Sequence, residues 1–276
     1  MPRAVFGAHG HAFTVEADDS LLTARAEAVL STLRLGEHDP KGQYVLTRRD
    51  DGTTSLTYDG EEIGSRYTDD SLLLLLHWHV NQRVIDGAAA RRTTFHAAAA
   101  RSPRGHGILL PAPMESGKTT TVTGLLRTGW DFLTDEAAGV DPDGTVWAYP
   151  KPLTIDRGSW PLFPDLQPDS VAEKAESWLV PATRAGAGVA GQAPLRLIVF
   201  PQYDPTHDTA LTRLRPSETA LELSQSTFQF DRYGARDLRC VSALARSVPA
   251  YRLTIGDLTA AVDLIGRLDA GLAVAA

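Results

Sequence analysis

The sequence contains one cysteine, Cys240, among 276 residues. A single thiol cannot form a disulfide within the chain, which fits a reducing compartment. No apolar run approaches the roughly 20 residues that a membrane-spanning helix needs, and Leu72–Leu76 is far too short. The first residues also lack the long apolar segment of a secretion signal. These absences predict a cytoplasmic protein that does not act at a membrane.

Basic residues are also in the minority. The chain has 27 Lys and Arg against 34 Asp and Glu, a net charge of -7, and no basic block. A nucleic-acid partner requires a positive footprint, so the composition argues against one. The 43% apolar and 22% charged residues are ordinary for a globular protein. The length is sufficient for one large domain, or for a small domain and a medium one.

The most informative stretch spans residues 94–141, where the pattern predicts a strand, a tight loop, a helix and a second strand. The loop ends in Gly117-Lys118-Thr119-Thr120 and follows the apolar segment GILLPA. Loop amides and a helix N-terminus favour phosphate, and Lys118 can reach the outer phosphates of a nucleotide. The predicted nucleotide-binding residues are Ala112, Pro113, Met114, Glu115, Ser116, Gly117, Lys118, Thr119 and Thr120.

This loop departs from the usual GxxxxGK[ST] pattern. Ala112 stands where the first glycine is expected, and Glu115 adds a negative charge close to the predicted phosphate site. Glycine is the usual residue where the backbone takes uncommon angles or approaches a ligand closely, so Ala112 requires a different path for the loop. The alternative interpretation is a chance GKTT at an ordinary helix start.

An acidic pair follows the loop. The apolar segment Phe132–Thr134 leads into Asp135 and Glu136, and an apolar run that ends in an acid is typical of a second, metal-organising strand. The predicted Mg²⁺ ligands are the hydroxyl of Thr119 and the carboxylate of Asp135. His96 lies in a short apolar strand, where a histidine is usually a satisfied core residue.

These motifs together resemble the catalytic core of the HPr serine kinase/phosphorylase family, whose fold is similar to that of phosphoenolpyruvate carboxykinase. The matching segments are Phe95-His96-Ala97, GILL, SGKTT, Arg127-Thr128-Gly129 and FLTDEAAGVD. The resemblance is strong over roughly residues 90–155, looser over 195–268, and does not cover the first ninety residues.

The resemblance implies a kinase that uses ATP or GTP with Mg²⁺ and phosphorylates a hydroxyl. By position it makes His96, Asp135 and Glu136 catalytic, although Glu136 stands where the family has a second aspartate. No segment clearly matches the region that recognises HPr, so the nearer likeness is to HPr-kinase-like proteins found beside peptide-modification genes. The expected acceptor is a peptide serine or a small metabolite, and a homo-oligomer is left open.

Two other functions remain as alternatives. Ala112 and Glu115 favour a nucleotide-responsive binding or regulatory protein with a degenerate loop and little transfer activity. A carboxykinase-like enzyme of small acids is a third hypothesis, against which no second lysine and histidine set of metal ligands is visible.

The predicted fold class is α/β: a small α+β N-terminal subdomain over residues 1–85, then a P-loop domain over residues 86–276 with a mixed, phosphoenolpyruvate-carboxykinase-like sheet. Turn signals between residues 38 and 68 predict a three-strand meander. Asp69, Asp70 and Ser71 start a buried helix that is expected to end at Gly87.

The later part of the chain adds weaker candidates. Arg213 and Arg215 precede a predicted helix and could bind phosphate or an acceptor carboxylate, although a solvated strand edge is the commoner arrangement. Residues 156–194 suggest loops around one helix, SVAEKAESWLV, and serve either as an acceptor-binding lid or as a surface excursion. Exposed Trp160 and Phe163 would favour the acceptor-binding role.

Overall fold

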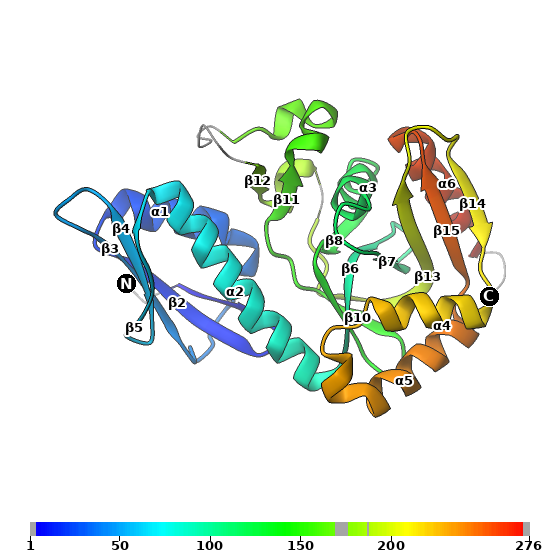
Figure 1. The fold of residues 1–276 in the computed structure, drawn as a ribbon, viewed down its shortest axis with the longest axis horizontal. Coiled ribbons are helices and arrows are strands. Elements are labelled where there is room, and N and C mark those ends of the chain that lie inside the picture. The colour runs from blue at the N-terminus through cyan, green and yellow to red at the C-terminus, as the bar shows by residue number, and fades with distance from the viewer. Residues whose placement is uncertain (1–3, 169–175, 187, 273–276) are drawn as a thin grey trace.

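Two β-sheets of unequal size organise the chain (Figure 1). The computed structural model describes residues 4–168, 176–186 and 188–272. The protein is mixed α/β, with 39% helix and 33% strand in mixed sheets, which confirms the predicted class at this level. In Figure 1 the five-stranded N-terminal sheet lies at the left and the eight-stranded sheet at the right.

The N-terminal sheet has the order β1-β2-β3-β4-β5, in which only the β2–β3 pair is parallel. Its last three strands are the predicted meander. Its inward side chains, among them Phe6, Phe13 and Leu46, form one core with helices α1 and α2. The elements are β1 (Val5–Ala8), β2 (His11–Ala17), α1 (Ser20–Val29), η1 (Ser31–Leu33), β3 (Gln43–Arg48), β4 (Thr54–Tyr58), β5 (Glu61–Tyr67) and α2 (Asp69–Arg91).

Helix α2 starts as predicted and ends later. The Thr68 hydroxyl accepts a hydrogen bond from the Ser71 amide and caps the first turn. The expected end at Gly87 is wrong, because the helix continues to Arg91 with Ala88 and Ala89 fully buried. A Cβ at Gly87 would lie 3.2 Å from the carbonyl oxygen of His9, so this glycine permits a close approach of the β1–β2 turn. The proposed boundary between residues 85 and 86 falls inside α2, and the division into two domains stays a prediction.

The larger sheet has the order β10-β9-β6-β7-β13-β15-β14, with β8 also paired to β6. Strand β13 is central and runs parallel to both β7 and β15, whereas the other pairings are antiparallel. The strands are β6 (Thr93–Arg101), β7 (Gly107–Pro111), β8 (Asp131–Thr134), β9 (Ala137–Val140), β10 (Thr145–Trp147), β13 (Gln192–Tyr203), β14 (Ala210–Arg213) and β15 (Ala250–Ile255).

Helices cover both faces of this sheet. Helices α3 (Lys118–Leu126) and α6 (Leu258–Leu272) pack on one face, against β6, β7, β13 and β15. Helices α4 (Pro216–Gln225) and α5 (Phe230–Ser247) pack on the other face. Cys240 lies in this second core with 7% of its surface exposed, as expected of a core residue. The α3 layer holds the loop on which the functional predictions depend.

The described residues between 153 and 186 form short strands and helices rather than the expected loops. It forms the hairpin pair β11 (Leu153–Asp156) and β12 (Ser177–Val180) with the short helices η2 (Arg157–Leu162), η3 (Pro164–Leu166) and η4 (Ala182–Ala185). Trp160 stacks on Trp178 with ring centroids 4.6 Å apart, and Phe163 is 4% exposed. Trp160 is half-buried and Phe163 is buried, so the exposure that would have favoured an acceptor-binding role is not observed. The helix expected over 170–180 falls partly on 169–175, outside the described residues, and Ser177–Val180 are strand.

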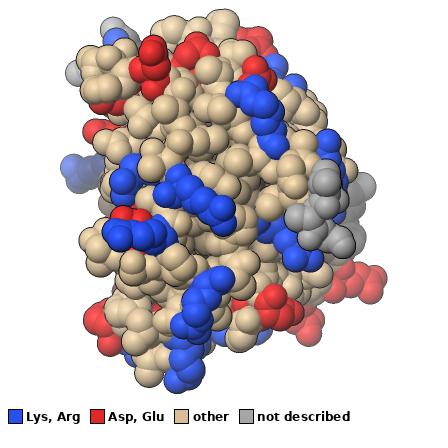
Figure 2. Space-filling model, turned by 90° about the vertical axis from the view of Figure 1, so that its right-hand side faces the viewer, with Lys and Arg blue, Asp and Glu red and all other residues tan. Residues whose placement is uncertain are grey.

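One face of the molecule carries both basic and acidic side chains (Figure 2). On the face in Figure 2, Lys and Arg side chains lie across the middle, and Asp and Glu lie mainly toward the margins. Among the described residues, no helix combines the length and the apolar character required to cross a bilayer.

Four histidines make the stability of the fold depend on pH. Burial is the main cause that lowers the pKa of His9, His11 and His96 to about 4 and that of His77 to about 3. Between pH 6.5 and these values the unfolded chain binds more protons than the folded chain, so stability falls as the pH falls. The raised pKa values of Glu136 and Asp156, also caused mainly by burial, act in the opposite direction near the acidic end.

We therefore expect the free energy of unfolding to decrease steadily from pH 7 to pH 5. A fully buried histidine contributes a slope approaching about 1.4 kcal/mol per pH unit in this range. Urea unfolding at four pH values measures it, with His77→Gln as the test variant and His207→Gln, an exposed histidine, as the control. The slope should decrease in the first variant and remain unchanged in the second. Equal slopes in all three proteins would contradict the assignment.

Candidate functional site

The loop between β7 and α3 spans residues 112–117, and its uncommon backbone angles lie in its second half. Positive φ angles occur at Glu115 (61°) and Gly117 (91°), whereas Ala112 is not among the residues with positive φ. Of these two residues only Gly117 is a glycine, the residue type that adopts positive φ most easily. Ala112 is 5% exposed, and its backbone angles do not require a glycine. The departure from the usual pattern at Ala112 is therefore compatible with the path that this loop takes.

Lys118 closes the loop on itself. Its ammonium donates to the carbonyl oxygens of Ala112 at 2.7 Å and Pro113 at 2.5 Å, and the residue is 7% exposed. The Ser116 hydroxyl donates to the same Pro113 carbonyl at 2.8 Å. Burial lowers the pKa of Lys118 to about 8, while the nearby carboxylates of Glu136 and Asp135 act against this shift. The Lys118 ammonium is thus held by two carbonyl groups of its own loop.

The other predicted loop residues differ in environment. Met114 is 79% exposed and contributes no polar contact. Thr120 hydrogen-bonds to Ser159 of η2 through their hydroxyl groups at 2.6 Å. Thr119 lies in the first turn of α3, and its hydroxyl donates to Asp135 Oδ2 at 3.4 Å. The structure therefore brings together the two residues predicted as Mg²⁺ ligands.

Asp135 is buried and held from several sides. Its Oδ1 lies 2.8 Å from the Lys151 ammonium, and both side chains are 1% exposed. Its Oδ2 also accepts a hydrogen bond from the Thr154 amide at 3.1 Å. The hydroxyl of Thr119 and the carboxylate of Asp135 are hard oxygen donors, the kind that Mg²⁺ uses in phosphate-transferring sites. The donor set therefore fits this ion, with two ligands from the protein.

Asp135 and Glu136 lie at a bend, not within one strand. The segment expected as a single strand forms two, β8 and β9, and the acidic pair connects them. The Thr134 hydroxyl accepts the amides of Glu136 at 3.2 Å and Ala137 at 3.3 Å, which stabilises the bend. Two residues in a continuous strand would point to opposite faces. The bend lets both carboxylates contribute to one site.

Glu136 lies against His96. Their closest atoms, Glu136 Oε1 and His96 Nε2, are 3.7 Å apart. Burial is the largest cause that raises the pKa of Glu136, while the charge of Lys151 and, to a smaller extent, the side chain of Asn81 on α2 act in the opposite direction. Burial, followed by the charge of Lys118, lowers the pKa of His96 to about 4. At neutral pH the imidazole is therefore uncharged.

Lys151 is the site residue that sequence reasoning missed. It lies between β10 and β11, flanked by Pro150 and Pro152. Beyond Asp135, its ammonium donates to the Pro152 carbonyl at 3.1 Å and the Thr154 hydroxyl at 3.0 Å. A lysine between two prolines directly after an apolar strand was the available signal. Nothing in the sequence identified its partner.

Arg213 and Arg215 lie elsewhere. Arg213 is on β14, the edge strand, which β13 and β15 separate from β7 in the sheet. Arg215 caps α4 and pairs with Glu218 at 2.9 Å, with 78% of its side chain exposed. The structure does not bring either arginine to the Lys118 loop.

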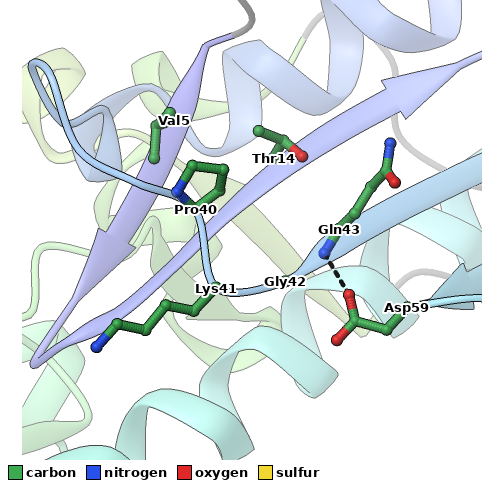
Figure 3. Close-up of a pocket in the computed structure, with 7 residues that line it drawn as sticks. All are labelled: Val5, Thr14, Pro40, Lys41, Gly42, Gln43 and Asp59. Carbon is green, nitrogen blue, oxygen red and sulfur yellow. Dashed lines mark hydrogen bonds between the residues drawn. The ribbon is translucent and has the colours of Figure 1, made fainter.

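Other parts of the chain provide weaker candidates for a functional site. The described residues contain no group of three or more His, Cys, Asp or Glu side chains suited to a metal ion. A hollow of about 640 Å³ lies in the N-terminal unit, lined by Thr14, Lys41 and Asp59 among others (Figure 3). Its Asp59 carboxylate accepts the Gln43 amide at 2.8 Å and caps a strand end. The residues that line this hollow do not form a cluster of catalytic or metal-binding side chains.

Comparisons with known proteins do not assign the chain: no protein-family model matches it, and no curated protein sequence is significantly similar to it. The resemblance to HPr-kinase-like proteins therefore rests on the residues quoted above, and function has to be argued from the geometry.

The buried pair makes a prediction about stability. Lys151→Met leaves the Asp135 carboxylate buried without its cation, which should cost about 3–5 kcal/mol of unfolding free energy. Arg127→Met removes the surface pair with Asp165, whose side chains are 37% and 59% exposed, and should cost far less because solvent screens the two charges. Denaturant unfolding at pH 7 compares the two variants. The double variant Lys151→Met/Asp135→Leu should recover part of the loss. A Lys151→Met cost no larger than that of Arg127→Met would disprove the structural role of the pair.

Proposed function

We propose that the protein is a kinase that transfers phosphate from ATP or GTP, with Mg²⁺, to a hydroxyl of a peptide serine or a small metabolite. The main support is the contact between Thr119, at the start of the helix that follows the Lys118 loop, and the buried carboxylate of Asp135. A loop lysine, a helix-start hydroxyl and an acid after an apolar strand are the parts that phosphoryl transfer uses. We also propose that residues 86–276 form a P-loop domain of the HPr-kinase-like type.

In this proposal the loop amides and Lys118 bind the outer phosphates. Lys118 exchanges the carbonyls of Ala112 and Pro113 for phosphate oxygens, and the phosphate charge compensates its burial. Thr119 and Asp135 would hold Mg²⁺, which neutralises charge on the transferring phosphate when bound. Lys151 positions Asp135 for this role by fixing one of its oxygens.

Glu136 and His96 are the proposed proton acceptors. A proton acceptor works best when its pKa is near the working pH and it reaches the reacting hydroxyl. The raised pKa of Glu136 makes this carboxylate a stronger base than an exposed one. His96 adjoins Glu136, but burial lowers its pKa to about 4 and makes the imidazole a weaker base, so its role in this proposal is to orient the carboxylate or, less effectively, to take the proton itself.

A second candidate is a nucleotide-responsive regulatory protein. The observation that favours it is the satisfied state of Lys118, which already donates to two loop carbonyls. Glu115 on the same loop adds a charge that repels phosphate. Binding of nucleotide without transfer to any acceptor distinguishes this function from a kinase.

We expect Lys118→Ala to abolish ATP and GTP binding, because it removes the loop's only cation while leaving the apolar strand and helix intact. Calorimetry with Mg²⁺ present measures the affinity, and circular dichroism checks the fold. Lys41→Ala, in the N-terminal hollow, is the matched control and should bind as the original protein does. Unchanged affinity in Lys118→Ala would remove the basis for a phosphate-binding loop.

We expect Glu136→Gln and His96→Ala each to lower single-turnover phosphate transfer by about a hundredfold or more, the usual effect of a positioned proton acceptor. Nucleotide affinity should change little, because neither side chain belongs to the loop. If both variants transfer at the original rate, the proton acceptor is a different group and the catalytic part of the proposal fails.

A further inference from the structure

An exposed aromatic side chain, that of Tyr203, lies beside the Lys118 loop. Tyr203 is the last residue of β13, and 58% of its surface is exposed. Its backbone amide donates to the carbonyl oxygen of Ser116 at 3.2 Å. A Cβ at Gly117 would lie 3.7 Å from the Cβ of Tyr203. The tyrosine is therefore a direct neighbour of the two residues through which the loop enters α3.

Tyr203 points to the face of the larger sheet that α3 and α6 cover. Along β13, Val199 belongs to the core under these helices, whereas Phe200 belongs to the core under α4 and α5. Side chains alternate along a strand, so Tyr203 lies on the same face as Val199. Its register partner on β15, Ile255, also belongs to the α3 and α6 core. The preceding residue, Gln202, points to the other face and lines a pocket of about 380 Å³ beside α4.

The Lys118 loop lies between Tyr203 and the acidic residues. In the sheet β8 pairs with β6, β6 with β7, and β7 with β13. Asp135 directly follows β8 and Tyr203 ends β13, so they flank the loop that follows β7. Three strand spacings of about 4.8 Å separate β8 from β13 by roughly 14 Å. An extended ligand that crosses the loop can therefore approach both residues.

The proposed chemistry sets the direction of a nucleotide on this loop. The proposed Mg²⁺ ligands Thr119 and Asp135 are in contact, and the proposed proton acceptor Glu136 follows Asp135. The transferring phosphate therefore belongs on the β8 side. The nucleoside is attached to the other end of the triphosphate, so it leaves the loop on the β13 side. Tyr203 presents an aromatic ring there, and such rings stack on nucleobases.

The backbone that carries this ring is fixed by the neighbouring turn. The Asp204 amide donates to the Ile255 carbonyl at 3.0 Å. The Thr209 hydroxyl, further along the same loop, accepts the Asp257 amide at 2.8 Å. These bonds join the loop after β13 to the segment between β15 and α6. The position of Tyr203 is thus set before a ligand binds, which reduces the entropy lost on binding.

The polar side chains that follow Tyr203 bind one another. The Asp204 carboxylate accepts the Thr206 amide at 3.0 Å and the Thr206 hydroxyl at 2.6 Å. The same carboxylate lies 2.8 Å from His207 Nδ1. These hydrogen-bonding groups are used within the turn and do not read the edge of a base. Stacking alone discriminates weakly, because every base has a π-face.

We propose that Tyr203 is the stacking platform for the purine base of the nucleotide, and that this contact does not distinguish adenine from guanine. The inference rests on the proposed kinase function and adds to it a residue that binds the nucleoside. The triphosphate crosses the Lys118 loop, with its base at Tyr203 and its outer phosphate at Asp135.

Calorimetry on the full chain with Mg²⁺ tests this proposal, with ATP, GTP and inorganic tripolyphosphate as probes. We expect ATP and GTP to bind within about threefold of each other. Tyr203→Ala should lower both affinities by about fivefold or more, the lower end of the usual loss when base stacking is removed. The affinity for tripolyphosphate should remain unchanged, because that probe has no base. Tyr203→Phe keeps the ring and should bind all three probes as the original protein does.

Gln202→Ala is the matched control, because Gln202 is the exposed neighbour whose side chain lies on the other face of the sheet. It should leave all three affinities unchanged. Lower nucleotide affinity in Gln202→Ala but not in Tyr203→Ala would place the base in the pocket beside α4 and overturn the proposal. Unchanged nucleotide affinity in Tyr203→Ala, or an equal loss for tripolyphosphate, also overturns it.

Two further outcomes are separate. A preference of more than about tenfold between ATP and GTP in the original protein would contradict a base contact that consists of stacking alone. Failure of the original protein to bind any of the three probes rejects the phosphate-binding loop itself. That outcome refutes the proposed function and removes this proposal with it.

Discussion

The ion pair between Lys151 and Asp135 is the interaction on which the arrangement of the candidate site depends. Both side chains are 1% exposed, so each charge has lost its water and requires protein partners. Those partners come from the start of α3, from the bend between β8 and β9, and from the start of β11. Displacing the bend would separate the two charges, and displacing either of the other segments would remove a hydrogen bond from one of them. The pair therefore fixes the relative positions of the loop helix and the acidic residues.

The same burial sets the protonation of the site. Two ammonium groups, on Lys118 and Lys151, lie among the carboxylates of Asp135, Glu136 and Asp156. Desolvation shifts the pKa of Lys118 downward and those of Glu136 and Asp156 upward, so each of these groups moves toward its neutral form. A bound polyphosphate would add negative charge beside Lys118 and favour its charged form. With two ammonium groups against three carboxylates, the free site has no excess of positive charge, and an anionic ligand would change the protonation of these groups.

Local patterns predicted the parts of the fold that depend on local interactions. The apolar GILLPA followed by GKTT predicted the β7–loop–α3 unit, and Asp69, Asp70 and Ser71 predicted the start of α2, whose capping residue is Thr68. Tertiary contacts determined what the patterns could not predict. Gly87 continues its helix because the chain packs closely at His9, and Phe163 is buried although its segment is rich in proline and glycine. Lys151 was missed because its partner is another segment's carboxylate, which spacing in the sequence does not identify.

Helix α2 gives the N-terminal unit a physical connection to the site, although the first ninety residues bear no family resemblance. One side of this helix packs into the core of the N-terminal sheet through Leu72, Leu76 and Val80. Its other contacts reach the site, because Asn81 influences the pKa of Glu136, and the pKa of His77 is lowered mainly by burial and further by the charge of Lys151. Since α2 is continuous to Arg91 and leads directly into β6, a rigid connection runs from the N-terminal sheet to the strand that bears His96. The N-terminal unit therefore helps to set the environment of Glu136, the group whose basicity the proposed chemistry requires.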